Sequence, residues 1–466
     1  MTVVIPYGLP ENWGWTSLAD IADIIMGSSP PSSSYNKEKT GLPFYQGKTD
    51  FGSLSPTPRV WCSSPYKVAE EGDVLISVRA PVGPTNLCVE KSCIGRGLGA
   101  IRPRDGIPSL FVLFYLRSIE KNVAQMGTGS TFTAIKRSDL ESLPFPLAPL
   151  NEMRRIVARV EALFAESKTA REALDKVPVL LRRFRQSVLA KAFRGELTQR
   201  DPNDEPAQKL LRKIKQERQF KEEYKYREPQ PIDEELYPLP EGWIWARLGQ
   251  ITHVIKDHID PNEKPEEEFN YLSIENIESE SGELVNFSPT LGKDIHSTKL
   301  VFTNQDLLYS KLRPYLNKVH VPKFSGVSAT DLIPLRPEGG IPREYIAYYL
   351  RTQRVVEYAN QKVRGIQLPR LPVDDLLSLF IPIAPLKEMN RIVLKINDLF
   401  SLAKAIENMV KRAKDRADRI DQAILAKAFR GELVPQDPND EPASVLLQRL
   451  KSKTKQQSTI QAKLTN

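Results

Sequence analysis

The amino-acid sequence predicts two copies of an α/β or α+β module, separated by two long helices that pair antiparallel as a coiled coil. Three observations support this prediction: a long internal repeat, a heptad pattern inside it, and short β-like runs between the repeated parts. With 466 residues the chain is too long for a single hydrophobic core, and we expect two or three domains.

The closest match between the two halves lies at their ends. LAKAFRGEL at residues 189–197 returns at 425–433, and DPNDEPA at 201–207 returns at 437–443. Both are displaced by 236 positions, as from Gly195 to Gly431, and 16 of 21 residues between 187–207 and 423–443 are identical. The same offset relates APLNEMRRIV at 148–157 to APLKEMNRIV at 384–393. A register kept this long predicts one rigid arm in each half.

Upstream of the arms, the halves share only landmarks. LPENW at 9–13 matches LPEGW at 239–243, GDVLIS at 72–77 matches QDLLYS at 305–310, and FYLRS at 114–118 matches YYLRT at 348–352. Short β-like runs at 74–78, 307–309 and 380–383, with a helix around 110–125 or 346–361, predict the mixed fold class. The predicted boundaries are 1–147 for the first module, 148–207 for the first arm, 208–238 for a charged helix and linker, 239–383 for the second module, 384–443 for the second arm and 444–466 for a charged C-terminal tail.

Each arm carries a stripe of apolar or small residues in alternating steps of four and three, which is typical of a coiled coil. In the first arm it comprises Ile156, Val160, Leu163, Ser167, Ala170, Leu174, Val177, Leu181, Phe184 and Val188. In the second arm it comprises Ile392, Ile396, Leu399, Ala403, Ile406, Val410, Ala413, Ala417, Ile420 and Ile424. A stripe this narrow needs a partner, and the obvious partner is the other arm.

The arms have predictable ends and one predicted irregularity. Gly195 and Gly431 indicate C-terminal helix caps. A helix of about 44 residues would be about 66 Å long, so the pair should hold the modules apart. Pro178 has no counterpart in the second arm, where Lys414 stands, and predicts a kink or break near residues 174–177. Because the arms are alike, we expect a fragment of about residues 1–207 to dimerise through its single helix.

Composition narrows the functional class. Lys and Arg outnumber Asp and Glu by 66 to 58, and the isoelectric point near 9.1 suits a polyanionic partner. Cys62, Cys88 and Cys93 have no C-x-x-C spacing, which predicts neither disulfides nor a zinc site and favours the cytoplasm. The first residues do not resemble a signal peptide, and no apolar run of about 18 residues occurs, so we expect no membrane partner.

No motif predicts catalysis or cofactor binding. The GKT at residues 47–49 lacks the glycine that a phosphate-binding loop needs at position 42, where Leu42 stands. The G-x-G-x-G at 95–99 indicates a tight turn rather than a dinucleotide site. The four histidines, all in the second module, are not paired as metal ligands. We therefore expect no enzyme activity, metal or cofactor in this chain.

Basic and amide side chains lie instead in the divergent parts of both modules, beside the landmark strands. Arg reads guanine bidentately, Asn and Gln read adenine, and Lys or Ser more often hold phosphate. An ordinary surface role remains the alternative for each. Aromatic neighbours such as Phe44, Tyr45, Tyr271 and Tyr315 are expected to pack in cores. The candidate DNA contacts are Gln46, Lys48, Ser77, Arg79, Ser130 and Thr131 in the first module, and Ser273, Asn276, Ser310, Lys311, Arg313, Arg364 and Gln367 in the second.

These motifs resemble those of the specificity subunits of type I restriction-modification systems over essentially the whole chain. The resemblance lies in L-P-E-x-W opening each half, D-x-L in each module, P-L-x-E-M-x-R-I-V leading each arm and L-A-K-A-F-R-G-E-L closing it. Met153 and Met389 depart from the family, which usually has Gln there. Two alternatives remain: a two-module coiled-coil scaffold, and an enzyme with an unrecognised site.

The resemblance implies two target-recognition domains, each reading one half of a split asymmetric DNA sequence, with the helices setting the spacer. It further implies docking of two adenine-specific methyltransferase subunits and, through them, of ATP-driven restriction subunits. S-adenosylmethionine, ATP and magnesium would belong to those partners. The closing motifs would supply docking or bundle-closing residues, namely Phe193, Arg194, Gly195, Phe429, Arg430 and Gly431.

Overall fold

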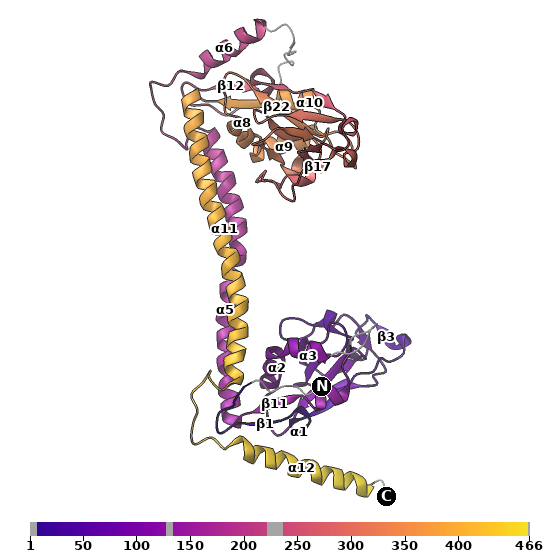
Figure 1. Cartoon of the computed structure of the whole chain (residues 1–466). Helices are drawn as coiled ribbons and strands as arrows, with labels where there is room; N and C mark the ends of the chain where they lie inside the picture. Colours follow the sequence, from indigo (N-terminus) through magenta and orange to yellow (C-terminus); the bar gives the residue numbers. More distant parts are fainter. Residues whose placement is uncertain (1–6, 127–133, 221–235, 465–466) are drawn as a thin grey trace. The chain divides into compact units, whose positions relative to one another are not determined.

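The computed structural model describes residues 7–126, 134–220 and 236–464. The chain forms two compact units, Met1–Asp175 with Lys411–Asn466, and Lys176–Val410. Each unit contains one module and parts of both long helices. The boundaries between the units therefore lie inside the arms, whereas the sequence predicted boundaries at the ends of the arms. Both modules combine helices with small sheets, which confirms the predicted fold class (Figure 1).

The first module is built on two sheets. An antiparallel sheet has the order β2-β10-β7-β8, a mixed sheet has the order β3-β5-β4-β9-β6, and β1 pairs with β11. The predicted helix around 110–125 is divided at Ile119 into α2 and α3. The elements are β1 (Gly14–Ser17), α1 (Leu18–Ile21), β2 (Ala22–Met26), β3 (Tyr35–Asn36), β4 (Leu42–Tyr45), β5 (Trp61–Cys62), β6 (Val68–Ala69), β7 (Val74–Ser77), β8 (Thr85–Leu87), β9 (Ser92–Ile94), β10 (Leu98–Pro103), α2 (Ser109–Ser118), α3 (Glu120–Met126), α4 (Arg137–Glu141) and β11 (Pro144–Leu147), with 3-10 turns η1 (Ser32–Ser34) and η2 (Lys48–Asp50).

The second module repeats this plan. Its sheet β13-β22-β19-β20 corresponds to β2-β10-β7-β8, and β12 pairs with β23 as β1 does with β11. The elements are β12 (Ile244–Arg247), α7 (Leu248–Ile251), β13 (Thr252–Val254), β14 (His258–Ile259), β15 (Glu268–Phe269), β16 (Tyr271–Leu272), β17 (Thr290–Leu291), β18 (Lys299–Phe302), β19 (Leu307–Ser310), β20 (Val319–His320), β21 (Gly326–Ser328), β22 (Leu332–Pro337), α8 (Arg343–Leu350), α9 (Gln353–Lys362), α10 (Val373–Ser378) and β23 (Phe380–Ile383), with 3-10 turns η3 (Pro261–Glu263), η4 (Ile274–Asn276), η5 (Gly292–Asp294) and η6 (Pro314–Leu316).

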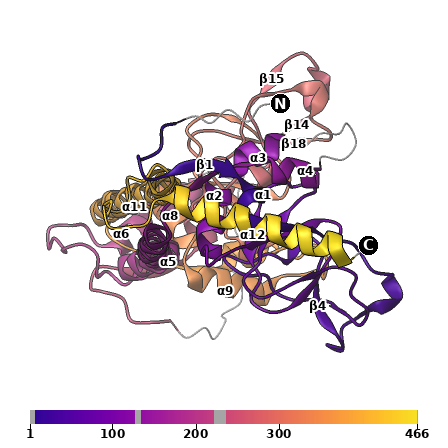
Figure 2. The same ribbon diagram turned by 90° about the horizontal axis from the view of Figure 1, so that it is seen from below.

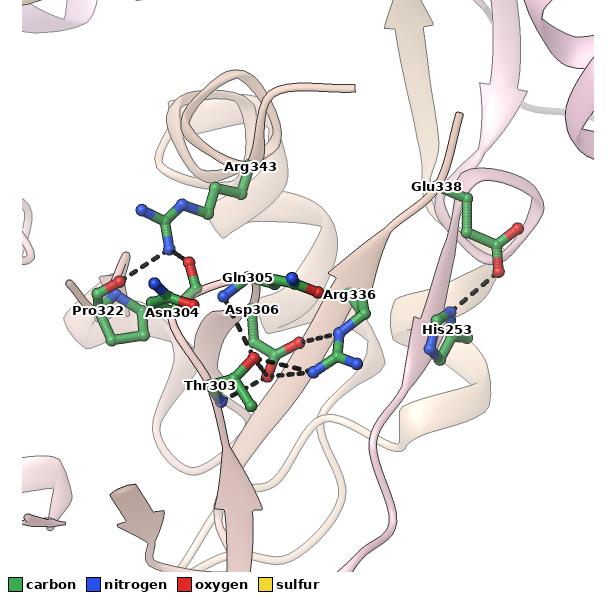
Figure 3. Close-up of polar contacts among 9 residues, drawn as sticks. All are labelled: His253, Thr303, Asn304, Gln305, Asp306, Pro322, Arg336, Glu338 and Arg343. Atoms are coloured by element: carbon green, nitrogen blue, oxygen red, sulfur yellow. Dashed lines mark hydrogen bonds and ion pairs between the residues drawn. The ribbon is translucent and has the colours of Figure 1, made fainter. Parts of the chain in front are cut away.

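The aspartate of the D-x-L landmark has the same structural role in both modules. Asp306 is fully buried and accepts hydrogen bonds from the Thr303 amide at 2.7 Å and from Nε of Arg336 at 2.7 Å (Figure 3). In the first module Asp73 accepts equivalent bonds from the Glu70 amide at 2.9 Å and from Arg102 at 2.8 and 2.9 Å. Each carboxylate therefore closes the turn before β7 or β19 and ties it to the neighbouring strand.

The arms are two helices of 44 residues each, α5 (Leu150–Phe193) and α11 (Leu386–Phe429). Within each unit they pair antiparallel: the first part of α5 lies against the last part of α11 in one unit, and the last part of α5 lies against the first part of α11 in the other (Figure 1). The α5 helix continues through Pro178, so the predicted break is wrong and the alternative of a kink stays a prediction. Proline lacks the backbone N–H and so removes one hydrogen bond of the helix. The hydrogen bonds of the neighbouring turns maintain the helix on both sides.

Most of the predicted seam is buried or half-buried. Ile156, Val160, Leu181, Val188, Ile392, Ile396, Ala403, Ala417 and Ile424 are buried, and Leu163, Ser167, Leu174, Val177, Leu399, Ile406, Val410 and Ala413 are half-buried. Three positions are wrong, because Ala170, Phe184 and Ile420 are exposed, Ile420 by 53%. The next residue, Arg171, Arg185 or Asp421, turns inward instead. The seam therefore advances by four residues and then three at each of these places, instead of by three and then four as predicted. Both spacings fit a coiled coil, and here the ion pairs between the helices favour the observed one.

Each arm is followed by a helix that packs on a module. The predicted caps are confirmed: Gly195 and Gly431 have φ of 73° and 71°. Helix α6 (Ala207–Phe220) buries Ala207 and Ile214 in the core of the second module. Helix α12 (Ala443–Leu464) lies beside α1 (Figures 1 and 2) and buries Ala443, Leu446 and Leu450 in the first module's core. Residues 444–464 are therefore helical rather than a tail, and the beginning of this helix packs on the core because an apolar residue recurs there at helical spacing among the charges.

Candidate nucleic-acid interface

A tight turn after β7 organises the candidate residues of the first module. Ser77 is buried, and its hydroxyl donates to the Arg79 carbonyl at 3.0 Å. The DNA contact predicted for Ser77 stays a prediction, while its hydroxyl has a structural role inside the protein. It holds the turn that leaves Arg79 exposed.

Four of the predicted residues line one hollow beyond this turn. Its volume is about 190 Å³, and Gln46, Lys48, Ser77 and Arg79 border it together with Ser29, Arg96 and Gly97. Gln46, Lys48, Arg79 and Arg96 are exposed. Ser29 and Arg96 were not predicted from the sequence, although Arg96 stands inside the G-x-G-x-G turn and its basic side chain was a usable signal.

The Asp50 carboxylate and Gly97 hold the loop on the other edge of the hollow. Asp50 is buried and accepts from the Gln46 amide at 2.7 Å and from Arg59 Nη2 at 2.5 Å, which fixes the loop that carries Gln46 and Lys48. A Cβ on Gly97 would lie 2.2 Å from the Gln46 carbonyl oxygen. Only glycine permits this approach, so the G-x-G-x-G segment is the tight turn that the sequence predicted.

The second module has the same turn after β19. Ser310 is buried and its hydroxyl donates to the Leu312 carbonyl at 2.9 Å, so this serine too positions a loop. The following residue, Arg313, is exposed and left-handed, with φ of 49°. Non-glycine residues pay for that conformation, and such strain clusters at functional sites.

A second loop lies against this turn. The Arg313 amide donates to the Pro369 carbonyl at 2.8 Å, the Leu371 amide donates to the Lys311 carbonyl at 2.8 Å, and Arg364 and Arg370 exchange two backbone bonds of 2.9 Å. The loop therefore brings Arg364 and Gln367, both exposed, close to Lys311 and Arg313. In the first module the Ile135 amide donates in the same way to the Val78 carbonyl. The candidates Ser130 and Thr131 lie outside the described residues.

Two carboxylates partly neutralise the positive charge of these two loops. Arg370 binds Asp331 bidentately at 3.0 Å, which raises the pKa of the guanidinium, and Lys311 Nζ lies 3.6 Å from the same carboxylate. Arg364 lies 3.9 Å from Asp375. These pairs orient the cations in the free protein without burying them.

Two other candidates have internal roles. Ser273 donates its hydroxyl to Asn276 Oδ1 at 2.8 Å, and the Asn276 amide donates to the Asn286 carbonyl at 3.1 Å. They brace the loop after β16. Of the aromatic residues, Phe44 and Tyr45 are buried and Tyr271 is half-buried, as expected, but Tyr315 is 52% exposed beside Arg313.

The repeated motifs meet at the ends of the arms. In the first unit Trp13 Nε1 donates to Glu152 Oε2 at 3.0 Å, and Arg155 binds Asp440 at 2.6 Å. In the second unit Trp243 donates to Glu388 at 3.0 Å, and Arg391 binds Asp204. Burial raises the pKa of the Glu152 and Glu388 carboxyls, while the tryptophan hydrogen bonds oppose that shift.

The closing motif of each arm packs on the module of the other half. Phe429 lies 5.1 and 5.2 Å from the rings of Phe111 and Tyr115, and Phe193 lies 5.1 and 4.9 Å from those of Tyr345 and Tyr349. Both phenylalanines are buried in the chain's own cores, which supports the bundle-closing alternative for them. Arg194 and Arg430 are exposed. A Cβ on Gly195 or Gly431 would lie 2.5 or 2.3 Å from Pro240 or Pro10.

Sequence comparisons agree with this architecture. Residues 10–177 match a family model described as the type I restriction modification DNA specificity domain. The chain is 27% identical over 454 residues to the EcoDI specificity subunit of Escherichia coli, covering 95% of this chain and 96% of that one. The chain is thus similar to type I restriction-modification specificity subunits over nearly its whole length. A specificity subunit of Methanocaldococcus jannaschii, MjaX, described as putative, is 46% identical over 158 residues, which cover 33% of this chain and 37% of the relative.

A solved structure supports this fold. The HsdS subunit of Thermoanaerobacter tengcongensis superposes with a TM-score of 0.56 at 21% identity, over 92% of this chain and 99% of that one. Among the residues that the structure describes, no helix is long and apolar enough to cross a membrane. Within the same residues, His, Cys, Asp and Glu side chains form no group suited to hold a metal ion.

Proposed function

We propose that this chain acts as a specificity subunit and that each of its modules reads one half of a split asymmetric DNA sequence. The observation that supports this most strongly is the hollow where Gln46, Lys48 and Arg79 converge beyond the buried Ser77 turn. Its counterpart is the second module's loop pair around Arg313. In both modules exposed cations and amides project from a rigid turn, and such groups read base edges and hold phosphates.

We further propose that the chain catalyses nothing by itself. Its arms dock two adenine-specific methyltransferase subunits and, through them, ATP-driven restriction subunits. The exposed Arg194 and Arg430, which follow the buried closing phenylalanines, are the docking residues to test first. S-adenosylmethionine, ATP and magnesium bind to those partners. Methyl transfer to DNA by the isolated chain would contradict this division of labour.

The DNA-reading proposal is tested by comparing alanine variants in both modules. Arg79→Ala should relax one base position of one half-site, at a cost of about 1–3 kcal/mol, and Arg313→Ala should relax one position of the other half-site. Lys48→Ala should weaken binding to all sequences and reduce the salt slope by about one. Binding is measured on randomised duplexes with the methyltransferase present, and methylated sites are mapped by long-read sequencing.

Matched controls separate this effect from a general loss of charge. Lys91 is exposed and pairs with Glu70. It precedes β9, whereas the hollow lies after the end of that strand, so Lys91→Ala should leave the target and the salt slope unchanged. If Arg79→Ala and Arg313→Ala altered the same half-site, or if neither changed any position, the proposed interface would be wrong.

Docking is tested with Arg194→Glu and Arg430→Glu. We expect each variant to weaken co-purification of a methyltransferase subunit while leaving the thermal unfolding midpoint unchanged, because both side chains are exposed. Arg200→Glu, a charge reversal at another exposed arginine beyond the first arm, is the control. Normal methyltransferase binding by the Arg194 and Arg430 variants would remove these residues from the proposed docking surface.

A further inference from the structure

The seam between the arms contains a charged layer in each unit. In the first unit Arg171 of α5 binds Asp421 and Asp418 of α11 at 2.8 and 3.0 Å. The Arg171 and Asp421 side chains are 32% and 22% exposed, so both are partly withdrawn from water. This layer replaces the apolar contact that the heptad pattern predicted at Ala170 and Ile420.

The second unit has a corresponding layer. Arg185 of α5 binds Glu407 of α11 through two hydrogen bonds of 2.8 and 3.0 Å, and the side chains are 25% and 34% exposed. The Arg185 hydrogen bonds lower the pKa of the Glu407 carboxyl. We call these two contacts, Arg171 with Asp421 and Arg185 with Glu407, the polar layers.

The internal repeat relates the polar layers to each other. At the offset of 236 positions, Glu407 is the counterpart of Arg171 and Asp421 is the counterpart of Arg185. Both layers therefore use the same two repeat positions. In both, the first arm supplies the cation and the second arm supplies the anion.

The polar layers distinguish the two arms, which are otherwise similar along the seam. The buried seam residues Val160 and Val188 correspond to Ile396 and Ile424, and the closing motifs are identical. If two first arms paired antiparallel, Arg171 would face Arg185 in both layers. If two second arms paired, Glu407 would face Asp421 in both. Like charges held opposite in a partly dry seam oppose association.

We propose that the polar layers select pairing of the first arm with the second and exclude pairing of identical arms from two copies of the chain. A more exposed pair, Asp175 with Lys414, acts in the same direction. Its counterpart positions are Lys411 and Pro178, so two second arms would also set Lys411 against Lys414. This selectivity argues against the expectation that a fragment of residues 1–207 dimerises.

The double variant Arg185→Glu/Glu407→Arg isolates the effect. In the intact chain its exchanged layer still joins one cation to one anion, and the Arg171 layer is untouched. Each arm now carries one charge of each sign at the two positions, so identical arms become complementary. The variant therefore removes the selectivity while keeping the intramolecular contacts.

Pairing is measured on a chain that is nicked but complete. A protease site within residues 221–235 is cleaved after purification, and the two parts are unfolded in urea, refolded and weighed by native mass spectrometry. We expect the natural sequence to reassemble only as mixed pairs. In the double variant we expect pairs of identical parts to approach about half of the total, the statistical value when selectivity is lost.

A second readout avoids refolding. The two parts are made together in one cell as separate chains, and the first part carries either of two tags. The two tags should co-purify only for the double variant. The control Arg183→Glu/Asp415→Arg makes the same charge changes at exposed positions of the same helices and should behave as the natural sequence. Mixed pairs alone from the double variant, or identical pairs from the natural sequence, would overturn the proposal.

Discussion

The crossed packing of the arm ends predicts that a mutation near the C-terminus loosens the first module. Phe429 is 1% exposed and contacts Phe111 and Tyr115. Its replacement by alanine removes a buried ring and leaves a cavity, which costs about 3–5 kcal/mol. Phe193→Ala should cost a similar amount, but in the second module. Phe184, on the same helix, is 36% exposed, and Phe184→Ala should cost less than about 1 kcal/mol.

Hydrogen exchange reports where each variant loosens the protein. Phe429→Ala should accelerate amide exchange in α2, which carries Phe111 and Tyr115, and Phe193→Ala should accelerate it in α8. Each effect should be confined to its own unit, and Phe184→Ala should change neither helix. If Phe429→Ala loosened α8 and spared α2, the arm ends would not cross between the halves of the chain, and the packing described above would be refuted.

Three further predictions concern the arms. Ile396 is fully buried, so Ile396→Asp should cost several kcal/mol and lower the midpoint of thermal unfolding followed by circular dichroism, whereas Leu394→Asp, at a position 64% exposed, should change it little; equal midpoints would refute the seam. The Arg185 contact lowers the pKa of Glu407 below its ordinary value of 4.5, so this stabilisation is present above pH 4.5 and lost as the pH falls through the lowered value; Glu407→Gln should flatten the loss of stability in acid, and an unchanged urea midpoint profile between pH 3 and 6 would contradict it. Pro178 is exposed within a continuous helix, so Pro178→Ala should raise stability by up to about 3 kcal/mol, and a lower unfolding midpoint would show that the proline is needed.

Much of the candidate interface could be predicted from residue types beside landmark strands. Gln46, Lys48 and Arg79 do border one hollow, and Lys311 and Arg313 do share a loop pair. Residue type could not show that Ser77 and Ser310 turn inward, because a serine hydroxyl satisfies a backbone carbonyl as readily as it binds a phosphate. Arg96 was missed for the opposite reason: its turn was correctly interpreted, but the direction of its side chain depends on the strands that flank it.

The sequence by itself determined the duplication, the length of the arms and their ends. Each of these depends on a local pattern: repeated words at one offset, heptad spacing, and a glycine that caps each helix at Phe193 or Phe429. Only the tertiary structure decided that each closing motif packs on the other half's module and that α12 belongs to the first core. It also decided that Arg171 and Asp421, rather than Ala170 and Ile420, face the seam. The physical reason is that helical periodicity is set within one chain segment, whereas the side chain that turns inward is chosen by what the partner helix presents.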